Sequence, residues 1–207
     1  MTAPPLPRLI LGSASPRRAA LLRQLGLDFE RLVCPEEEPP ADGRPPAEHA
    51  IRAARAKARG VDRMARERGR STGAIVIGAD TVVRVDGAAL GKPADPEDAA
   101  RMLRLLSGRT HQVYTGIVLI TEDGRELDDC AETHVRMRAL SEADIHTYVR
   151  SGEPLDKAGA YGIQGLGARF IEHVQGCYYN VVGLPLARLS SLLEEAGFEF
   201  SATIRDE

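Results

Sequence analysis

The feature that most limits the possible folds is the run Ala74-Ile75-Val76-Ile77-Gly78-Ala79, which is apolar at almost every position. A strand with one face in water alternates apolar and polar side chains, whereas a strand covered on both faces reads as a continuous apolar run. The chain has another short apolar run at Arg8–Gly12 and a long proline-free segment rich in Ala and Arg at 47–68. Strand-length and helix-length segments alternate in this way along the sequence, which predicts an α/β fold with a buried sheet flanked by helices.

Two long strand-like segments, His111–Thr121 and Glu126–Arg138, flank an Asp123-Gly124 turn signal and predict an antiparallel hairpin. The sheet is therefore expected to be mixed. The 207 residues, of which 43% are hydrophobic, suffice for one sizeable core, and we see no repeat or flexible linker that would divide them. We predict a single domain over residues 1–207, with residues 1–8 as a loose N-terminal extension.

Charge and segment composition disfavour several classes of protein. The chain has 27 Lys+Arg against 30 Asp+Glu and a net charge of −3, whereas proteins that coat nucleic acids carry a strongly basic face. No apolar stretch approaches the roughly 18 residues that cross a bilayer, and the N-terminus lacks the layout of a signal peptide. Three cysteines without a C-x-x-C pair fit reduced thiols. We predict a cytoplasmic protein without nucleic-acid or membrane partners.

The first candidate site is the loop Gly12–Arg18, which leaves a predicted strand and enters a predicted helix. Ser15 suits the N-cap of that helix and Pro16 its first position. Small residues let backbone N–H groups gather around an anion, and the helix N-terminus adds partial positive charge. Arg17 and Arg18 in the first turn oppose the helix dipole unless an anion binds there. The segment is not a Walker A loop; it predicts phosphate binding, with a capped surface helix and two solvated arginines as the alternative.

The second candidate is Asp80-Thr81, which directly follows the buried run, at the expected end of its strand. Ligands of open α/β sheets collect at strand carboxyl ends, where a carboxylate can bind a divalent cation or activate a water. An Asp that merely ends the strand is the alternative. Gly91-Lys92-Pro93 follows the next strand-like segment and can bring an ammonium group to the same edge, which favours a functional site.

Lysine is rare in this chain, because only Lys57, Lys92 and Lys157 occur among the 27 basic residues. A coding bias towards arginine explains the surface but not the three lysines that remain. A compact ammonium group is chemically different from a planar guanidinium, especially against phosphate. We predict that at least two of the three are functional.

The third candidate is the glycine-dense segment 155–165, because such density costs backbone entropy and indicates a tight turn or a closely bound ligand. Gln164 offers a donor and an acceptor on one planar group, which matches a pyrimidine edge. An ordinary glycine-rich loop with an exposed glutamine is the alternative. The five histidines are scattered, and the acidic run Glu36–Glu38 is typical of a solvated loop, although one of its carboxylates could hold a metal.

Taken together, six segments closely resemble the Maf family of nucleoside triphosphate pyrophosphatases, in particular its dTTP/UTP branch. They are residues 11–18, 77–83, 91–93, 106–113, 151–165 and 181–186, which span nearly the whole chain in the family's order. The resemblance implies an elongated α/β fold with a deep cleft between two lobes, and a homodimer. It also implies hydrolysis of a nucleoside triphosphate to the monophosphate and pyrophosphate, assisted by Mg2+ or Mn2+.

The resemblance further implies that Asp80 accepts a proton and that Arg18, Glu38, Lys57 and Lys92 lie around the phosphates and the metal. With the loop residues Ser13 and Ser15, we expect a phosphate-binding group made of Ser13, Ser15, Arg18, Lys57 and Lys92, with Lys157 as a further candidate. Asp80 and Glu38 are the expected metal ligands. Arg17, Thr81 and Gln164 fall at positions that distinguish the branches of the family. The methylated-guanosine branch typically has Trp in place of Arg17 and Glu in place of Gln164, and this chain contains no Trp.

Two other functions remain open at this point. One is a nucleotide-binding regulator of septum formation with little catalysis, in keeping with the family's association with cell-division arrest. A pure binder, however, needs no positioned carboxylate and lysine at strand ends, and this chain has both. The other is a pyrophosphatase for noncanonical purine triphosphates on a related fold, which a comparison of substrates would distinguish.

Overall fold

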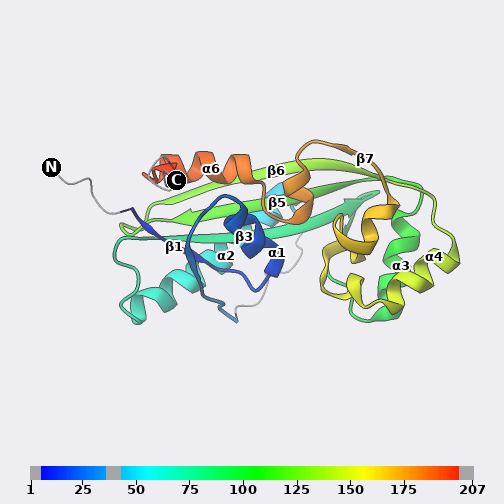
Figure 1. Cartoon of the computed structure of the whole chain (residues 1–207), viewed down its shortest axis with the longest axis horizontal. Helices are drawn as coiled ribbons and strands as arrows, with labels where there is room; N and C mark the ends of the chain where they lie inside the picture. Colours follow the sequence, from blue (N-terminus) through cyan, green and yellow to red (C-terminus); the bar gives the residue numbers. More distant parts are fainter. Residues whose placement is uncertain (1–5, 36–42, 201–207) are drawn as a thin grey trace.

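The computed structural model describes residues 6–35 and 43–200, and in this part of the chain seven strands form one mixed sheet (Figure 1). The strands are β1 (Arg8–Leu11), β2 (Phe29–Arg31), β3 (Ala74–Val85), β4 (Ala88–Leu90), β5 (Thr110–Ile120), β6 (Glu126–Met137) and β7 (Ile171–Gln175). Their order is β2-β1-β3-β5-β6-β7, and β4 also pairs with β3. Strand β1 is parallel to β2 and β3, and the other pairs are antiparallel. The predicted mixed sheet is confirmed.

Helices flank the sheet, and local sequence signals set where several of them begin. They are α1 (Pro16–Gln24), α2 (Pro46–Glu67), α3 (Pro96–Leu106), α4 (Glu142–Arg150), α5 (Tyr178–Val182) and α6 (Leu186–Glu195), with short 3-10 helices η1 (Glu153–Asp156), η2 (Ala158–Ala160) and η3 (Gly165–Phe170). As predicted, Ser15 caps α1, because its hydroxyl accepts the Arg18 N–H at 3.5 Å, and Pro16 occupies the first turn. No helix among the described residues is long and apolar enough to span a membrane.

The long strands β3, β5 and β6 run along the longest axis of the molecule, which is elongated (Figure 1). At one end, α2 covers one face of the sheet, whereas α1 and α6 cover the other. Each face has its own apolar cluster there, one with Ala54, Ala58 and Val76 and one with Leu22, Ile77 and Leu189. At the other end, α3 and α4 pack on the sheet over a third cluster. The predicted elongated fold with helices on a mixed sheet is therefore confirmed.

Two glycines let α2 lie unusually close to the sheet. A Cβ atom on Gly78 of β3 would stand 2.4 Å from the carbonyl oxygen of Ala54, and one on Gly116 of β5 would stand 2.5 Å from the backbone of Ala50 and Ile51. Both distances are far below van der Waals contact, so only glycine fits. This close approach fixes the position of every side chain that α2 directs at the sheet.

The structure corrects two expectations from the sequence. Strand β3 does not end at Asp80-Thr81 but continues to Val85, because these residues pair with Gly116 and Thr115 of β5 in an unbroken antiparallel ladder. A polar side chain does not interrupt a ladder that backbone groups make. The loose N-terminal extension does not include Arg8, which pairs with Ala74 in the sheet. Strand β7 and helix α5 were not predicted.

Candidate active site

A gap along one edge of β3 opens a cavity in the described structure. Strand β5 follows one edge of β3 from Val76 to Arg84, so β1 and β4 must share the other edge. Strand β1 reaches only as far as Ile77, and β4 pairs with β3 only from Val83 to Val85. Between these two points lies a cavity of about 430 Å³.

The cavity brings together nearly all the predicted site residues. It is lined by Ser13, Ser15, Arg17, Arg18, Lys57, Asp80, Thr81, Lys92, Lys157 and Gln164. The remaining predicted residue, Glu38, lies outside the described residues. These side chains come from segments spread over most of the chain, so the fold gathers what the sequence motifs mark separately.

The α1 loop forms one wall of the cavity, and Arg18 ties it to two other segments. The guanidinium donates to the Ser13 hydroxyl at 3.2 Å, to Thr81 Oγ1 at 3.0 Å and to the carbonyl oxygen of Gly183 at 2.8 Å. Thr81 Oγ1 lies 2.9 Å from the buried Thr115 hydroxyl. Arg18 is therefore held by the loop, by β3 and by the turn after α5, which fixes its charge beside the N-terminus of α1.

Asp80 and Lys57 form an ion pair across the β3–α2 contact. Lys57 Nζ lies 2.6 Å from Asp80 Oδ1, and Asp80 is only 8% exposed. Because successive strand residues point to opposite faces, Asp80 meets Lys57 on the α2 face while Thr81 meets Arg18 on the α1 face. Within the described residues the second carboxylate oxygen of Asp80 has no hydrogen-bond partner, so it remains available to a water or a cation.

The opposite wall carries a second group of charges. Arg17 Nη1 pairs with Asp156 Oδ2 at 3.0 Å, and Lys157 Nζ donates to Asp156 Oδ1 at 2.7 Å and to the carbonyl oxygen of Glu153. Burial opposes ionisation of Asp156, but hydrogen bonds from Lys157 and Arg17 outweigh it and lower the pKa of the carboxyl. Lys92 is exposed in the cavity and has no ion pair with any described residue.

Gln164 stands at the start of η3, exposed on the cavity wall. Its carboxamide makes no hydrogen bond within residues 6–35 and 43–200. An unpaired donor and acceptor on one rigid plane can recognise a ligand edge that presents the complementary pair.

The described lining of the cavity is electropositive, although the chain as a whole is not. Among the residues that the structure describes, five cations line the cavity (Arg17, Arg18, Lys57, Lys92 and Lys157) against two carboxylates (Asp80 and Asp156), whereas the whole chain carries a net charge of −3. Such a local excess of cations beside a helix N-terminus favours a polyanion such as a phosphate chain. The described residues contain no group of three His, Cys, Asp or Glu that could hold a metal by itself. Mg2+ commonly binds one or two carboxylates together with substrate phosphates, and Asp80 fits that role.

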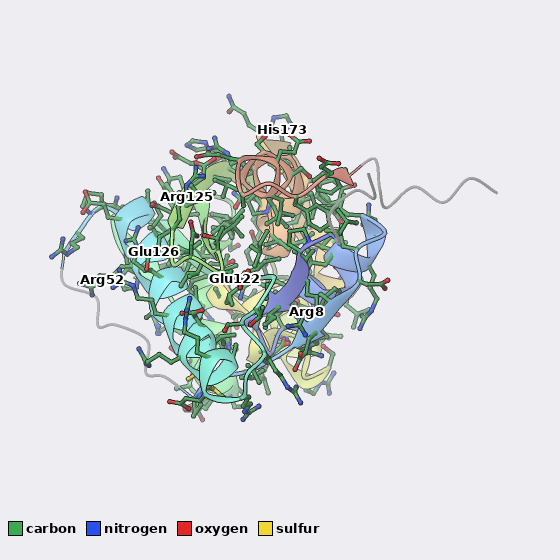
Figure 2. All side chains as sticks on the ribbon, turned by 90° about the vertical axis from the view of Figure 1, so that its left-hand side faces the viewer. Arg8, Arg52, Glu122, Arg125, Glu126 and His173 are labelled. Carbon is green, nitrogen blue, oxygen red and sulfur yellow. The ribbon has the colours of Figure 1, made fainter. Side chains whose placement is uncertain are left out.

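A second hollow of about 400 Å³ lies at the β1 end of the molecule, where Glu122 and Arg125 lie (Figure 2). There Glu122 accepts the Gly73 N–H at 2.8 Å, and Arg125 pairs with Glu195 at 2.6 Å. These charges are matched within the chain, so the first cavity is the candidate active site.

Several residues around the cavity were missed by the sequence analysis. Asp156, Glu153 and Gly183 lie in segments that carry the family resemblance, but no role was predicted for them, because their main contacts form only in the folded chain, such as that of Asp156 with Arg17 and that of Gly183 with Arg18. Tyr161 lines the cavity, and its hydroxyl lies 2.7 Å from Nε2 of the buried His111. Burial lowers the pKa of His111 from 6.5 to about 4. The glycine density around Tyr161 was the one sequence signal for this layer.

Comparison with known proteins places the chain in a family. The family model described as Maf-like protein matches residues 8–196. The chain belongs to this family. A relative from Symbiobacterium thermophilum is 51% identical over 191 residues, covering 92% of this chain and 95% of the relative. One from Anaeromyxobacter dehalogenans (strain 2CP-C) is 48% identical over 195 residues, covering 93% and 95%. Both are named dTTP/UTP pyrophosphatase.

Solved structures with the same fold are much more distant from this Maf-like protein in sequence. The Ham1 protein of Staphylococcus aureus is 15% identical with a TM-score of 0.51, over 91% of this chain and 98% of that one. A HAM1 protein from Coxiella burnetii is 16% identical with the same TM-score, over 92% and 100%. These similarities establish the shared fold and nothing about substrate.

Proposed function

We propose that this Maf-like protein hydrolyses dTTP and UTP to the monophosphate and pyrophosphate. The observation that carries the proposal is the meeting of three components in one cavity: the Asp80–Lys57 pair, the cationic α1 loop and Gln164, whose carboxamide has no hydrogen-bond partner among the described residues. The names of the relatives from Symbiobacterium and Anaeromyxobacter support the same reaction. In it, a water oxygen bonds to the α-phosphorus, the bond from that phosphorus to the bridging oxygen breaks, and pyrophosphate leaves.

The triphosphate is proposed to lie along the α1 loop. Ser13, Ser15 and Arg18 contact its oxygens there, and the helix N-terminus adds favourable charge. Lys57 and Lys92 approach from the side of β3 and stabilise the charge that builds up on the leaving pyrophosphate. Lys157 is proposed to support its own loop, because its ammonium already donates to Asp156 and to the Glu153 carbonyl.

Asp80 is proposed to accept the proton of the attacking water. Its position on β3 places a carboxylate oxygen in the cavity, while Lys57 fixes the orientation of the group through the 2.6 Å contact. Asp80 and Glu38 would hold a Mg2+ or Mn2+ ion, which when bound neutralises charge on the phosphoryl oxygens.

Gln164 is proposed to read the base. Uracil and thymine each present an N–H beside a carbonyl oxygen, which a carboxamide pairs with two hydrogen bonds. A base with the wrong pattern leaves buried polar groups unpaired, so discrimination can be large. Thr81 is proposed to contribute through Arg18, and Arg17 through its pairing with Asp156 near the same loop.

The test is pyrophosphate release from dTTP, UTP, CTP and ITP, measured with Mg2+, with Mn2+ and with EDTA. We expect metal-dependent conversion of dTTP and UTP. Preferential turnover of ITP would keep the reaction and replace the substrate by noncanonical purine triphosphates. Nucleotide binding without turnover would instead point to a regulator of septum formation.

We also propose that the protein works in the cytoplasm as a homodimer, on free nucleotides and without nucleic-acid or membrane partners. The net charge of −3 supports the choice of partners, and family membership supports the dimer. Light scattering of the purified chain tests the dimer, and cell fractionation tests the location.

A further inference from the structure

Two side chains that the proposed reaction leaves unused hold the Gln164 loop at both of its ends. At the first end, the Gly162 N–H donates to the hydroxyl of Tyr148, on α4, at 3.1 Å. At the second end, the carboxylate of Glu153, at the start of η1, accepts the N–H groups of Leu166 at 2.8 Å and Gly167 at 3.1 Å. The two groups are joined, because the Tyr148 hydroxyl donates to Glu153 Oε1 at 2.9 Å.

The loop is wrapped so tightly around these groups that it requires glycine. A Cβ atom on Gly165 would stand 2.7 Å from Glu153 Oε2, and the residue has a φ of +72°. A Cβ atom on Gly167 would stand 2.4 Å from the Gly162 carbonyl oxygen and 2.7 Å from the Tyr148 hydroxyl. Gly165, which belongs to the glycine-dense segment 155–165, and Gly167 just beyond it thus permit this contact rather than close approach of a ligand.

The protonation states suit these hydrogen bonds. Burial opposes ionisation of Glu153, but the Leu166 and Gly167 amides and the Tyr148 hydroxyl outweigh it and lower the pKa of the carboxyl. Burial, with a smaller contribution from Glu153, raises the pKa of Tyr148. At neutral pH an ionised carboxylate therefore accepts hydrogen bonds from a protonated phenol and two amides.

We propose that Tyr148 and Glu153 are positioning residues that fix the Gln164 loop and thereby set the discrimination between bases. The inference rests on the proposed function, because it assigns a support to the residue proposed to read the base. Neither side chain lines the cavity, so both act through the loop. Loosening the loop weakens recognition of the base and leaves the phosphate subsite of Ser13, Arg18, Lys57 and Lys92 intact.

The test compares Tyr148→Phe and Glu153→Gln with the wild-type enzyme. Tyr148→Phe removes only a hydroxyl and keeps the ring packed on Phe170, at 5.1 Å between centroids, so it is expected to fold. For both variants we expect the kcat/KM ratio of UTP over CTP to fall about tenfold, mainly through a higher KM for UTP. Inorganic tripolyphosphate has no base, so we expect its inhibition constant for each variant to stay within about twofold of the wild-type value, which is about the scatter of such constants.

Glu172→Gln is the matched control. It makes the same charge change on β7, at an exposed glutamate that faces Arg136 at 3.6 Å, away from the cavity lining, and the UTP/CTP ratio stays at the wild-type value. Variants that retain the wild-type ratio would overturn the inference. The inference would also be overturned if tripolyphosphate binding weakened as much as UTP binding, since an equal loss indicates general disruption of the site. A wild-type enzyme without UTP turnover would overturn the proposed function itself.

Discussion

Replacing Gly78 by alanine tests whether close contact between α2 and β3 holds the site together. The added Cβ would stand 2.4 Å from the backbone oxygen of Ala54 and 2.8 Å from the Cβ of Ala58, where ordinary contact begins near 3.4 Å. The helix must therefore move by about 1 Å, because a backbone oxygen cannot rotate away. Overpacking of this kind costs about 1–3 kcal/mol, and we expect the upper part of that range for Gly78→Ala.

Urea denaturation of Gly78→Ala and Gly91→Ala measures this cost. A Cβ atom on Gly91 would have no described atom within 4 Å, and the residue has no positive φ, so Gly91→Ala shares the unfolded-state effect of a Gly→Ala change without the clash. We expect Gly91→Ala to stay within about 0.5 kcal/mol of the wild type, and Gly78→Ala to lose about 2–3 kcal/mol of unfolding free energy at an unchanged m-value.

The same displacement has a catalytic consequence, since Lys57 lies on α2 beside Ala58. A shift of about 1 Å stretches its 2.6 Å contact with Asp80 beyond a normal hydrogen bond, so kcat/KM for UTP is also expected to fall. If Gly78→Ala proved as stable as Gly91→Ala, α2 would not be packed tightly on β3 at Gly78. The explanation that this packing positions Lys57 would then be wrong as well.

Three further predictions address the cavity and its surroundings. Asp80→Asn should lower kcat at least about 100-fold while changing Tm by less than about 4 °C; near-normal turnover in steady-state assays would remove Asp80 from its role. Gln164→Glu should raise kcat/KM for CTP relative to UTP, because cytosine presents an amino donor, and an unchanged ranking of the two substrates would contradict this. Burial holds the folded pKa of His111 at about 4 against 6.5, so the unfolded state binds more protons between these values. Urea melts of the wild type should therefore show the free energy of unfolding falling by up to about 3 kcal/mol as the pH drops from 6.5 to 4. His111→Gln should show a smaller fall, and a pH profile identical to that of the wild type would contradict the prediction.

Local signals predicted the elements whose ends are set by neighbouring residues. Helix α1 begins after Ser15, whose hydroxyl caps it, and has Pro16 in its first turn, so the sequence suffices to place its start. The end predicted for β3 at Asp80 was wrong for the opposite reason. Whether a strand continues past a polar residue depends on its ladder partner, here Gly116 of β5, which lies 36 residues further along the chain.

The site residues that could be predicted are those whose residue type or local pattern already indicates a chemical role. Rare lysines, a capped glycine-serine loop and a glutamine among glycines are visible in one sequence, and the cavity gathers them. Glu153 and Tyr148 were missed, because their partners are backbone amides that any sequence possesses. Only the folded chain shows that one carboxylate receives two amides of a loop that begins nine residues later.

The open stretch of the β3 edge explains why the site can draw on both faces of the sheet. Asp80 and Thr81 are adjacent and point to opposite faces of the sheet. If β3 were paired along both edges at this point, the sheet would separate the two side chains and they could not share a cavity. Here β1 ends beside Ile77 and the pairing with β4 resumes only at Val83, so both side chains reach a single cavity. Lys57 enters it from α2 on one face and Arg18 from α1 on the other. Extending β1 by five paired residues, opposite residues 78–82 of β3, would close this edge, so the length of β1 is as much a requirement of the site as any side chain in it.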